Sequence, residues 1–263
     1  MPAATEPVAD GRVGRVGAAL AGLRSAAAFL TIVPVPLAAR PDGGFADAPA
    51  WFPLIGAAIG AAAGGVRAGL EPIVGRPAAT GLAMVVIAVI TGALHLDGLA
   101  DSADGLGVRG DRSHRLEVMR DSANGTFGTL ALVLWGLVTF AALASVSARQ
   151  CLELLIAAAA CGRWLGVIHG RLLAPARGDG LGSAFSPGPV QVGVGAMFAV
   201  AASLLALGPA HGAIVFAAAL AAGAVFSGFA HSAYGGQTGD TIGACVVLAE
   251  TAAILAGVAV LSA

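Results

Sequence analysis

The sequence predicts an all-α protein, a polytopic membrane helix bundle. Hydrophobic residues make up 57% of its 263 residues, charged residues only 11%, and the mean hydropathy is +0.87. Soluble domains carry about 25% charged residues, so most of this surface is expected to face lipid. Lipid admits only helices or closed barrels, and the apolar stretches lack the alternation of a barrel strand. Helices are therefore expected throughout.

Seven to eight stretches of about 20 mostly apolar residues are expected to span the bilayer. The least certain, 18–38, contains Pro34 and Pro36, which break a helix, so it either spans or lies in the interface. Residues 1–16 are expected to form a disordered tail, and 17–263 a single integral-membrane catalytic domain. The other seven spans are 51–70, 78–96, 127–147, 151–169, 190–208, 211–230 and 242–262.

Alternating these spans across the bilayer gathers the polar loops on one face. The opposite loops hold only Arg76 and Arg149, so the positive-inside rule makes the arginine-rich face cytoplasmic. Its Gly-rich segments are expected to build a single site. The net charge of −1 excludes strong electrostatic attraction to nucleic acid. The gathered loops are 38–50, 97–126, 170–189 and 231–241.

The most informative motif is His95-Leu-Asp-Gly-Leu-Ala-Asp-Ser-Ala-Asp-Gly, at the edge of a spanning stretch. Its carboxylates, Asp97, Asp101 and Asp104, stand at i, i+4 and i+7, which places them on one stripe of a helix. Like charges at this spacing repel, whereas Mg²⁺ would coordinate their oxygens and bridge to substrate phosphates. A solvated acidic helix end is the alternative. The position beside the membrane, where charge is costly, favours a site.

The loop that follows combines arginines with a Gly-rich helix start. Guanidinium groups suit phosphate oxygens, and free amides at a helix start bind phosphate. Two glycines around Thr126 indicate close approach of a ligand to the backbone. Asp121 is expected to complete the metal site that the aspartate stripe begins. The substrate-binding candidates in this loop are Arg109, Arg115, Arg120, Ser122, Gly125, Thr126 and Gly128.

A second Gly-rich helix start, Tyr234-Gly-Gly-Gln-Thr-Gly-Asp-Thr-Ile-Gly, contributes Thr238 and Asp240 as metal or substrate contacts. Glu250 lies deeper in the same apolar stretch. Because a charged side chain is costly inside a membrane, Glu250 is expected to pair with another charged group. Arg163 is the expected partner. A structural pair that fastens two helices and a pair that binds substrate are both open.

Carboxylates, arginines and glycine-rich helix starts on one face are the parts that metal-assisted displacement at phosphorus requires. A prenyltransferase or a CDP-alcohol phosphotransferase is a rival, because both place aspartates at helix ends around Mg²⁺. The sequence lacks a second separated Asp-x-x-x-Asp pair after Asp121, and Ala100-Asp101 does not match the phosphotransferase pattern. A transporter using Glu250 and Arg163 would show internal repeats, which are not evident.

These motifs resemble the cobalamin synthase family, the adenosylcobinamide-GDP ribazoletransferases. The resemblance runs in order from about residue 25 to residue 250. One position departs from it: many relatives carry Arg where this chain has Ile32, so no phosphate contact is assigned there. The matching segments are Phe29-Leu-Thr31, Pro34-Val-Pro36, Phe52-Pro-Leu-Ile-Gly56, 95–105, 117–128 and 238–243.

The resemblance implies a Mg²⁺-dependent transferase at the cell inner membrane, in the last stage of cobalamin biosynthesis. It would join adenosylcobinamide-GDP to α-ribazole, or to α-ribazole 5′-phosphate, and release GMP. His95 is the one nearby histidine to test as a general base. Carried onto this sequence, the catalytic carboxylates are Asp97, Asp101, Asp104 and Asp121, and the metal ligands are these four with Asp240.

Overall fold

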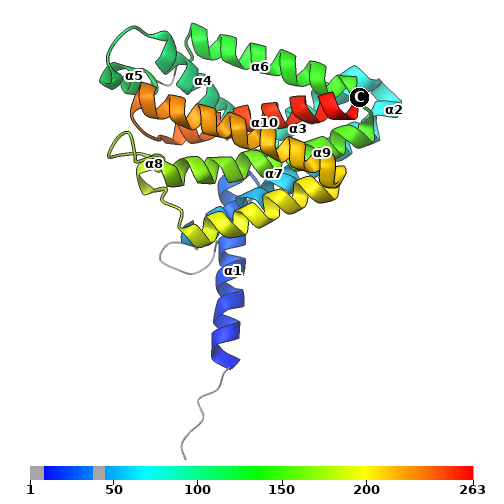
Figure 1. Ribbon diagram of the computed structural model, residues 1–263, viewed down its shortest axis with the longest axis horizontal. Helices are drawn as coiled ribbons and strands as arrows, with labels where there is room; N and C mark the ends of the chain where they lie inside the picture. The colour runs from blue at the N-terminus through cyan, green and yellow to red at the C-terminus, as the bar shows by residue number, and fades with distance from the viewer. Residues whose placement is uncertain (1–8, 38–44, 122, 263) are drawn as a thin grey trace, which may run out of the picture.

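The computed structural model describes residues 9–37, 45–121 and 123–262. Figure 1 shows a bundle of long helices that run side by side, with the first helix at a steep angle to them. Within the described residues the only β-type pairing is an isolated bridge between Pro175 and Gln237, so the all-α prediction is confirmed. In chain order the elements are α1 (Ala9–Leu30), the 3-10 helix η1 (Phe45–Trp51), α2 (Phe52–Val74), α3 (Arg76–Ile90), α4 (Leu94–Gly107), α5 (Arg112–Val118), α6 (Thr126–Ser145), α7 (Ala148–Leu172), α8 (Leu181–Ala184), α9 (Pro189–Tyr234) and α10 (Gly239–Leu261).

In the part of the chain that the structure describes, five helices are long and apolar enough to cross a membrane, and the bent pair α3–α4 is a sixth candidate. The five are α2 with η1, α6, α7, α9 and α10. The sequence predicted seven to eight spans, which is more. The apolar part of α1, Val16–Leu30, is shorter than a span, and α1 already begins at Ala9, inside the segment assigned to the tail.

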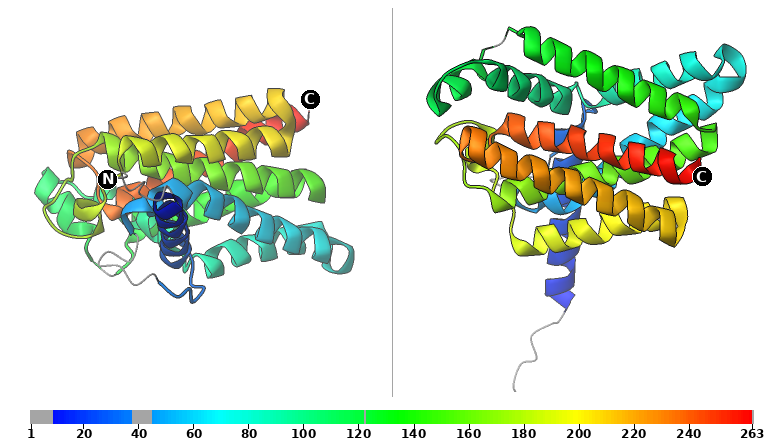
Figure 2. Two further views of the ribbon diagram at one scale, coloured as in Figure 1. Left: turned by 90° about the horizontal axis from the view of Figure 1, so that it is seen from below. Right: turned by 45° about the horizontal axis from the view of Figure 1, so that its top comes forward.

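The two spans predicted at 190–208 and 211–230 both belong to α9, which folds back on itself. Gly208 breaks the helix with a φ of 78°, and Pro209 follows it. Past the break, Gly212 packs so closely on the backbone of Ser203 that a Cβ there would overlap it. The two arms lie side by side in both views of this region (Figures 1 and 2). Both ends of α9 therefore reach the same end of the bundle.

Helix α7 forms the centre of the bundle and packs against α2, α9 and α10. Gly56, Gly60 and Gly64 form one stripe of α2, at every fourth residue, and a Cβ on any of them would overlap α7. Small residues at this spacing let two helix backbones approach closely in a membrane, where packing rather than water drives association. This stripe fixes α2 against α7.

One end of the bundle collects the polar loops. The chain segments after α7 and after α9 pair there: the Ala176 amide donates to the Gln237 carbonyl at 2.8 Å, and the Gln237 amide donates to the Ala174 carbonyl at 2.9 Å. The hydroxyl of Tyr234 donates to the carbonyl of Ser102 at 2.5 Å, which ties α9 to α4. The predicted gathering of 97–126, 170–189 and 231–241 is confirmed, whereas residues 38–44 of the fourth predicted loop, 38–50, lie outside the described residues.

The predicted span 78–96 is not straight. Between α3 and α4 the chain bends by 89°, and both Gly92 and Ala93 have a φ of 57°. The amide of Ala93 donates to the carbonyl of Ala88 at 2.8 Å, which closes α3. The amide of Ile32 donates to Ile90 at the same bend, also at 2.8 Å. Helix α4 thus starts within the bundle and carries the aspartate motif towards the loop end.

Candidate active site

The two acidic motifs of the sequence lie against each other where α4 crosses α10. A Cβ on Gly98 would lie 2.6 Å from the carbonyl oxygen of Asp240, and one on Gly243 would lie 3.3 Å from His95. Only glycine at position 98 allows this approach. The first turn of α4 and the first turn of α10 therefore form one surface, and both bring carboxylates to it.

Three carboxylates share this surface. Asp101 lies within electrostatic reach of Asp97 and Asp240 and also of the Arg177 guanidinium. Asp240 accepts hydrogen bonds from Arg177 Nη2 at 3.3 Å and from Thr238 Oγ1 at 3.2 Å. Asp97 is exposed. Asp97 and Asp240 line one pocket, so the acids of α4 and α10 converge from separate parts of the chain.

The predicted cluster of five metal-binding carboxylates is not assembled. Among the described residues, no group of three or more His, Cys, Asp or Glu side chains is arranged to hold a metal ion. Asp104 and Asp121 have other partners, described next. The oxygen donors that remain near one another are Asp97, Asp101 and Asp240.

Asp104 holds the start of α6. Its Oδ2 accepts from the Gly125 amide at 2.7 Å and its Oδ1 from the Gly128 amide at 2.8 Å, and the residue is buried. Two free amides of the helix start are thereby satisfied, and the carboxylate complements the helix dipole. A Cβ on either glycine would overlap this carboxylate. Gly125 and Gly128 were predicted to bind a ligand and Asp104 to bind a metal. In the structure the two glycine amides bind the Asp104 carboxylate instead.

The rest of this turn faces solvent. Asp121 is exposed, and its Oδ1 accepts from the Ala123 amide at 3.0 Å within the turn itself. Asp121 therefore does not complete a metal site with the acids of α4. Thr126 is exposed at the first residue of α6. Ser122, predicted to bind substrate, lies outside the described residues.

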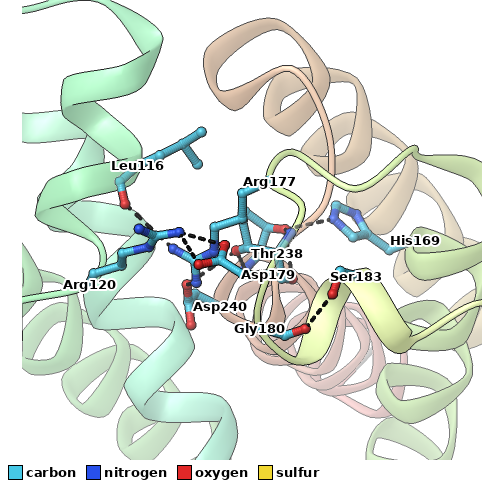
Figure 3. Close-up of polar contacts among 10 residues, drawn as sticks. Leu116, Arg120, His169, Arg177, Asp179, Gly180, Ser183, Thr238 and Asp240 are labelled. Carbon is cyan, nitrogen blue, oxygen red and sulfur yellow. Dashed lines mark hydrogen bonds and ion pairs between the residues drawn. The ribbon is translucent and has the colours of Figure 1, made fainter.

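Two guanidinium groups, of Arg120 and Arg177, lie near Asp240 (Figure 3). Arg120 makes an ion pair with Asp179, with Nη2 at 2.7 Å from Oδ2, and both side chains are more than half exposed. Arg177 reaches from the segment after α7 to Asp240, and its Nη1 donates to the carbonyl of Leu116 at 3.5 Å. Arg177 was not among the site residues predicted from the sequence. The sequence feature that could have indicated Arg177 is its position in a Gly-rich loop of the arginine-rich face.

The other two predicted arginines lie farther along the loop. Arg109 is exposed between α4 and α5, and Arg115 is half-buried on α5, within electrostatic reach of Tyr234. The start of α5 is capped by Asp111. The His114 amide and the Ser113 hydroxyl donate to this carboxylate at 3.0 and 2.7 Å, and they hold the pKa of Asp111 below its usual range. Helix α5 is thus built locally and presents its arginines at the loop end.

Thr238 positions Asp240. It caps α10, accepting from the Thr241 amide at 3.1 Å, and its own hydroxyl donates to Asp240. Thr238 is 1% exposed, so it supports the carboxylate instead of contacting substrate as predicted. The sequence analysis missed His169, whose ring nitrogens lie 2.9 Å from Ser227 Oγ and 3.1 Å from Thr241 Oγ1. This buried histidine locks the start of α10 to α7 and α9.

Glu250 and Arg163 form an ion pair between α10 and α7, as predicted. The side chain of Arg163 is 2% exposed and that of Glu250 is 17% exposed. Arg163 Nε is buried and makes no hydrogen bond within the described residues. Arg163 also lines the pocket that holds Asp97 and Asp240 at its edge.

This pocket, here called the aromatic pocket, has a volume of about 290 Å³. The Phe29 and Phe52 rings stack at 5.5 Å with an interplanar angle of 12°, and the Phe52 and Phe185 rings at 5.9 Å and 13°. His95 forms part of the wall and is buried. The pocket is lined by Phe29, Leu30, Phe52, Leu94, His95, Asp97, Gly98, Arg163, Gly166, Phe185, Gly239, Asp240, Ile242, Gly243 and Val246.

Comparison with known proteins matches the family described as cobalamin-5-phosphate synthase over residues 22–258. An adenosylcobinamide-GDP ribazoletransferase of Bradyrhizobium diazoefficiens is 39% identical over 250 residues, which cover 91% of this chain and 94% of the relative. The protein of that name from Geotalea daltonii is 36% identical, covering 88% and 94%. The one from Azorhizobium caulinodans is 37% identical, covering 90% and 94%. No solved structure matches.

Proposed function

The chain belongs to the cobalamin-5-phosphate synthase family, and on that premise we propose that it is an adenosylcobinamide-GDP ribazoletransferase. It joins adenosylcobinamide-GDP to α-ribazole, or to α-ribazole 5′-phosphate, and releases GMP. The products are adenosylcobalamin or its 5′-phosphate. The observation that carries the proposal is the convergence of Asp97, Asp101, Asp240 and Arg177 from three segments, with Asp97 and Asp240 among the residues that line one pocket.

The proposed reaction is a displacement at phosphorus. A ribazole hydroxyl forms a bond to the cobinamide-side phosphorus of the pyrophosphate, the bond from this phosphorus to the bridging oxygen breaks, and GMP leaves. Such a step needs little covalent chemistry from the protein; it needs positioning and cations around the phosphoryl oxygens. The hydroxyl proton passes to a group at the pocket, and His95 in its wall is the histidine to test.

We propose Mg²⁺ as the cofactor. Mg²⁺ is usually held by one or two carboxylates together with substrate phosphates and waters, rather than by a complete protein cage. Asp97, Asp101 and Asp240 supply hard oxygen donors of this kind, and the pyrophosphate would supply the remainder. When bound, the ion neutralises the phosphate charge. A site completed by substrate agrees with the absence of a ready three-ligand group among the residues described.

Arg177 and Arg120 are the proposed pyrophosphate contacts. Both lie near Asp240 (Figure 3), and both already pair with carboxylates, Arg177 with Asp240 and Arg120 with Asp179, that are anionic as a phosphate oxygen is. An exposed ion pair such as Arg120–Asp179 contributes little stability, so a phosphate can replace Asp179 at small cost. Arg177, held by Leu116 as well, would orient the phosphate nearer to Asp240.

The site end is proposed to face the cytoplasm, with the protein in the cell inner membrane. Its loops carry more arginines than the loops of the opposite end, which hold Arg76 and Arg149, as the positive-inside rule requires of cytoplasmic loops. Cysteine labelling with an impermeant maleimide on intact spheroplasts tests this. Arg149→Cys at the opposite end should react, and Ser183→Cys should react only after permeabilisation. The reverse pattern would invert the orientation.

The activity is tested with purified protein in lipid. GMP release should require adenosylcobinamide-GDP, α-ribazole or its 5′-phosphate, and Mg²⁺ together, with the cobalamin product formed in equal amount. GMP release without a ribazole would indicate a hydrolase. No GMP from folded protein with all three present would overturn the proposed function. Turnover of a prenyl diphosphate or a CDP-alcohol in the same assay would favour the rival transferases.

A further inference from the structure

We propose that the aromatic pocket binds the heterocyclic base of ribazole and so selects the attacking substrate. This base, a benzimidazole, is flat and apolar and has one unsubstituted ring nitrogen. The assignment rests on the proposed function, and it names the place of one substrate within that site. Three observations carry it: the walls of the pocket, the unpaired donor of Arg163, and the size and position of the cavity.

The walls suit a flat apolar ring. Phe29, Phe52 and Phe185 lie in nearly parallel planes, with interplanar angles of 12° and 13° between successive rings. Leu30, Ile242 and Val246 complete the apolar lining. Aromatic rings prefer offset-stacked or edge-to-face contacts with another ring, beyond the gain from burial alone. A benzimidazole suits this lining, because the unsubstituted ring nitrogen is the one atom of the base that needs a polar partner.

Arg163 supplies the one polar contact that such a base requires. Its Nε–H is buried within the bundle and has no acceptor among the described residues, which is costly. The unsubstituted ring nitrogen of a benzimidazole is an acceptor without a proton. We assign Arg163 Nε–H as the donor to that nitrogen. Glu250, paired with the same guanidinium, keeps it charged and oriented.

Size and position decide between the two substrates. At about 290 Å³ the pocket is at the lower limit of small-molecule sites, far too small for a corrinoid. Asp97 and Asp240 line its edge, so a base held inside places the ribose beside the carboxylates. Guanine is the competing occupant. Its polar edge needs several donors and acceptors, whereas the side chains around the cavity are mostly apolar.

The first test removes one ring. Phe29→Leu in lipid-reconstituted protein should weaken binding of α-ribazole, followed by benzimidazole fluorescence, by about 3- to 10-fold. The KM for adenosylcobinamide-GDP should not change. Phe216→Leu is the matched control, because Phe216 is also half-buried and stacks on an aromatic ring, Trp164, at 5.3 Å, but lies outside the aromatic pocket.

The second test leaves the protein unchanged. An α-riboside of the matching indole, in which CH replaces the unsubstituted nitrogen, should bind about 10-fold more weakly than α-ribazole, since Arg163 then loses its acceptor. In Arg163→Met, which has no donor at this position, the two ribosides should bind alike. Equal binding of both by the unaltered protein would overturn the role of Arg163. The comparison of the two ribosides on the unaltered protein does not depend on whether a variant folds.

The outcomes separate the pocket from the activity. Normal GMP release with equal ribazole affinity in Phe29→Leu and Phe216→Leu would overturn the pocket and leave the activity standing. A rise in KM for adenosylcobinamide-GDP alone would place guanine there instead. Absence of GMP release with Phe29-dependent ribazole binding would uphold the pocket and overturn the activity. Absence of both release and binding would overturn both.

Discussion

The starts of α6 and α10 look alike in sequence and differ in structure. Both are rich in glycine, and both precede an apolar helix next to a carboxylate. At α6 the carboxylate comes from another helix: Asp104 of α4 accepts from Gly125 and Gly128. At α10 the cap comes from the turn itself, because Thr238 accepts from the Thr241 amide. Asp240 is then left to face Arg177 and the acids of α4.

The difference shows when a helix start can take an external anion. Free amides and the helix dipole attract negative charge, and any carboxylate within reach can meet that demand. At α6 the protein supplies the anion, so the phosphate site expected there is already filled. At α10 a hydroxyl satisfies the cap and leaves a carboxylate beside two others, which is an arrangement suited to a cation.

The strongest test acts on the α10 side. Asp101→Asn should lower kcat by about 100- to 1,000-fold, because it removes a charge from the group of acids proposed to hold Mg²⁺. Thermal stability should stay the same or rise, since Asp101 is surrounded by other carboxylates. GMP release and thermal unfolding in the same lipid preparation check this. A near-normal kcat would remove Asp101 from the site.

The matching substitution on the α6 side should act on stability. Asp104→Asn leaves one amide of the α6 start without an acceptor and removes a charge-assisted hydrogen bond, at a cost of about 2 kcal/mol. A lower midpoint of thermal unfolding is expected, and surviving protein should keep its Mg²⁺ dependence. If Asp104→Asn were as stable as the unaltered protein but needed far more Mg²⁺, Asp104 would be a metal ligand after all.

The arginines beside the two helix starts should have a graded effect on substrate affinity. Arg177→Gln should raise the KM for adenosylcobinamide-GDP by about 10-fold, as expected for loss of one charge-assisted hydrogen bond. Arg120→Gln should raise it by about 3-fold or less, because Arg120 is more exposed. Steady-state kinetics at fixed ribazole concentration distinguish them. A larger effect of Arg120→Gln would place the pyrophosphate nearer to α6.

The smallest effect is expected at Asp121. This carboxylate caps only its own turn, so Asp121→Asn should change stability by about 0.5 kcal/mol or less and turnover by about twofold or less. The same assays apply. A loss of turnover comparable to that of Asp101→Asn would show that Asp121 joins the acids of α4 when substrate is bound.

The features that the sequence predicted depend on local signals. Hydropathy located the apolar helices, although it predicted more spans than the five to six candidates of the structure. The break between the predicted spans 190–208 and 211–230 marked the fold-back of α9, and the cost of a lone charge in an apolar helix paired Glu250 with Arg163. The stripe of three aspartates was also placed correctly on one helix. These predictions needed only neighbouring residues or the properties of the bilayer.

The roles of single side chains depended on neighbours distant in sequence. Helix α4 packs against both α6 and α10, so the two ends of one stripe meet different helices. Asp104 accepts from amides that lie 21 and 24 residues away in the sequence, and Arg177 donates to Asp240 at a separation of 63 residues. No periodicity encodes such contacts. A glycine that makes room for a carboxylate looks the same in sequence as one that makes room for a phosphate.

The left-handed turn at Gly92 and Ala93 is the link through which a movement of α3 would reach the carboxylates of α4. Helix α4 joins α3, its partner in the bent candidate span, through these two residues, and it packs against α6 and α10. A tilt of α3 strong enough to move α4 against that packing would carry Asp97 and Asp101 together, so their mutual spacing would be preserved while their gap to Asp240 changed. Bilayer thickness, which sets the tilt of a spanning segment, thereby becomes a variable of the reaction centre, and comparing rates in thin and thick lipid would measure its influence.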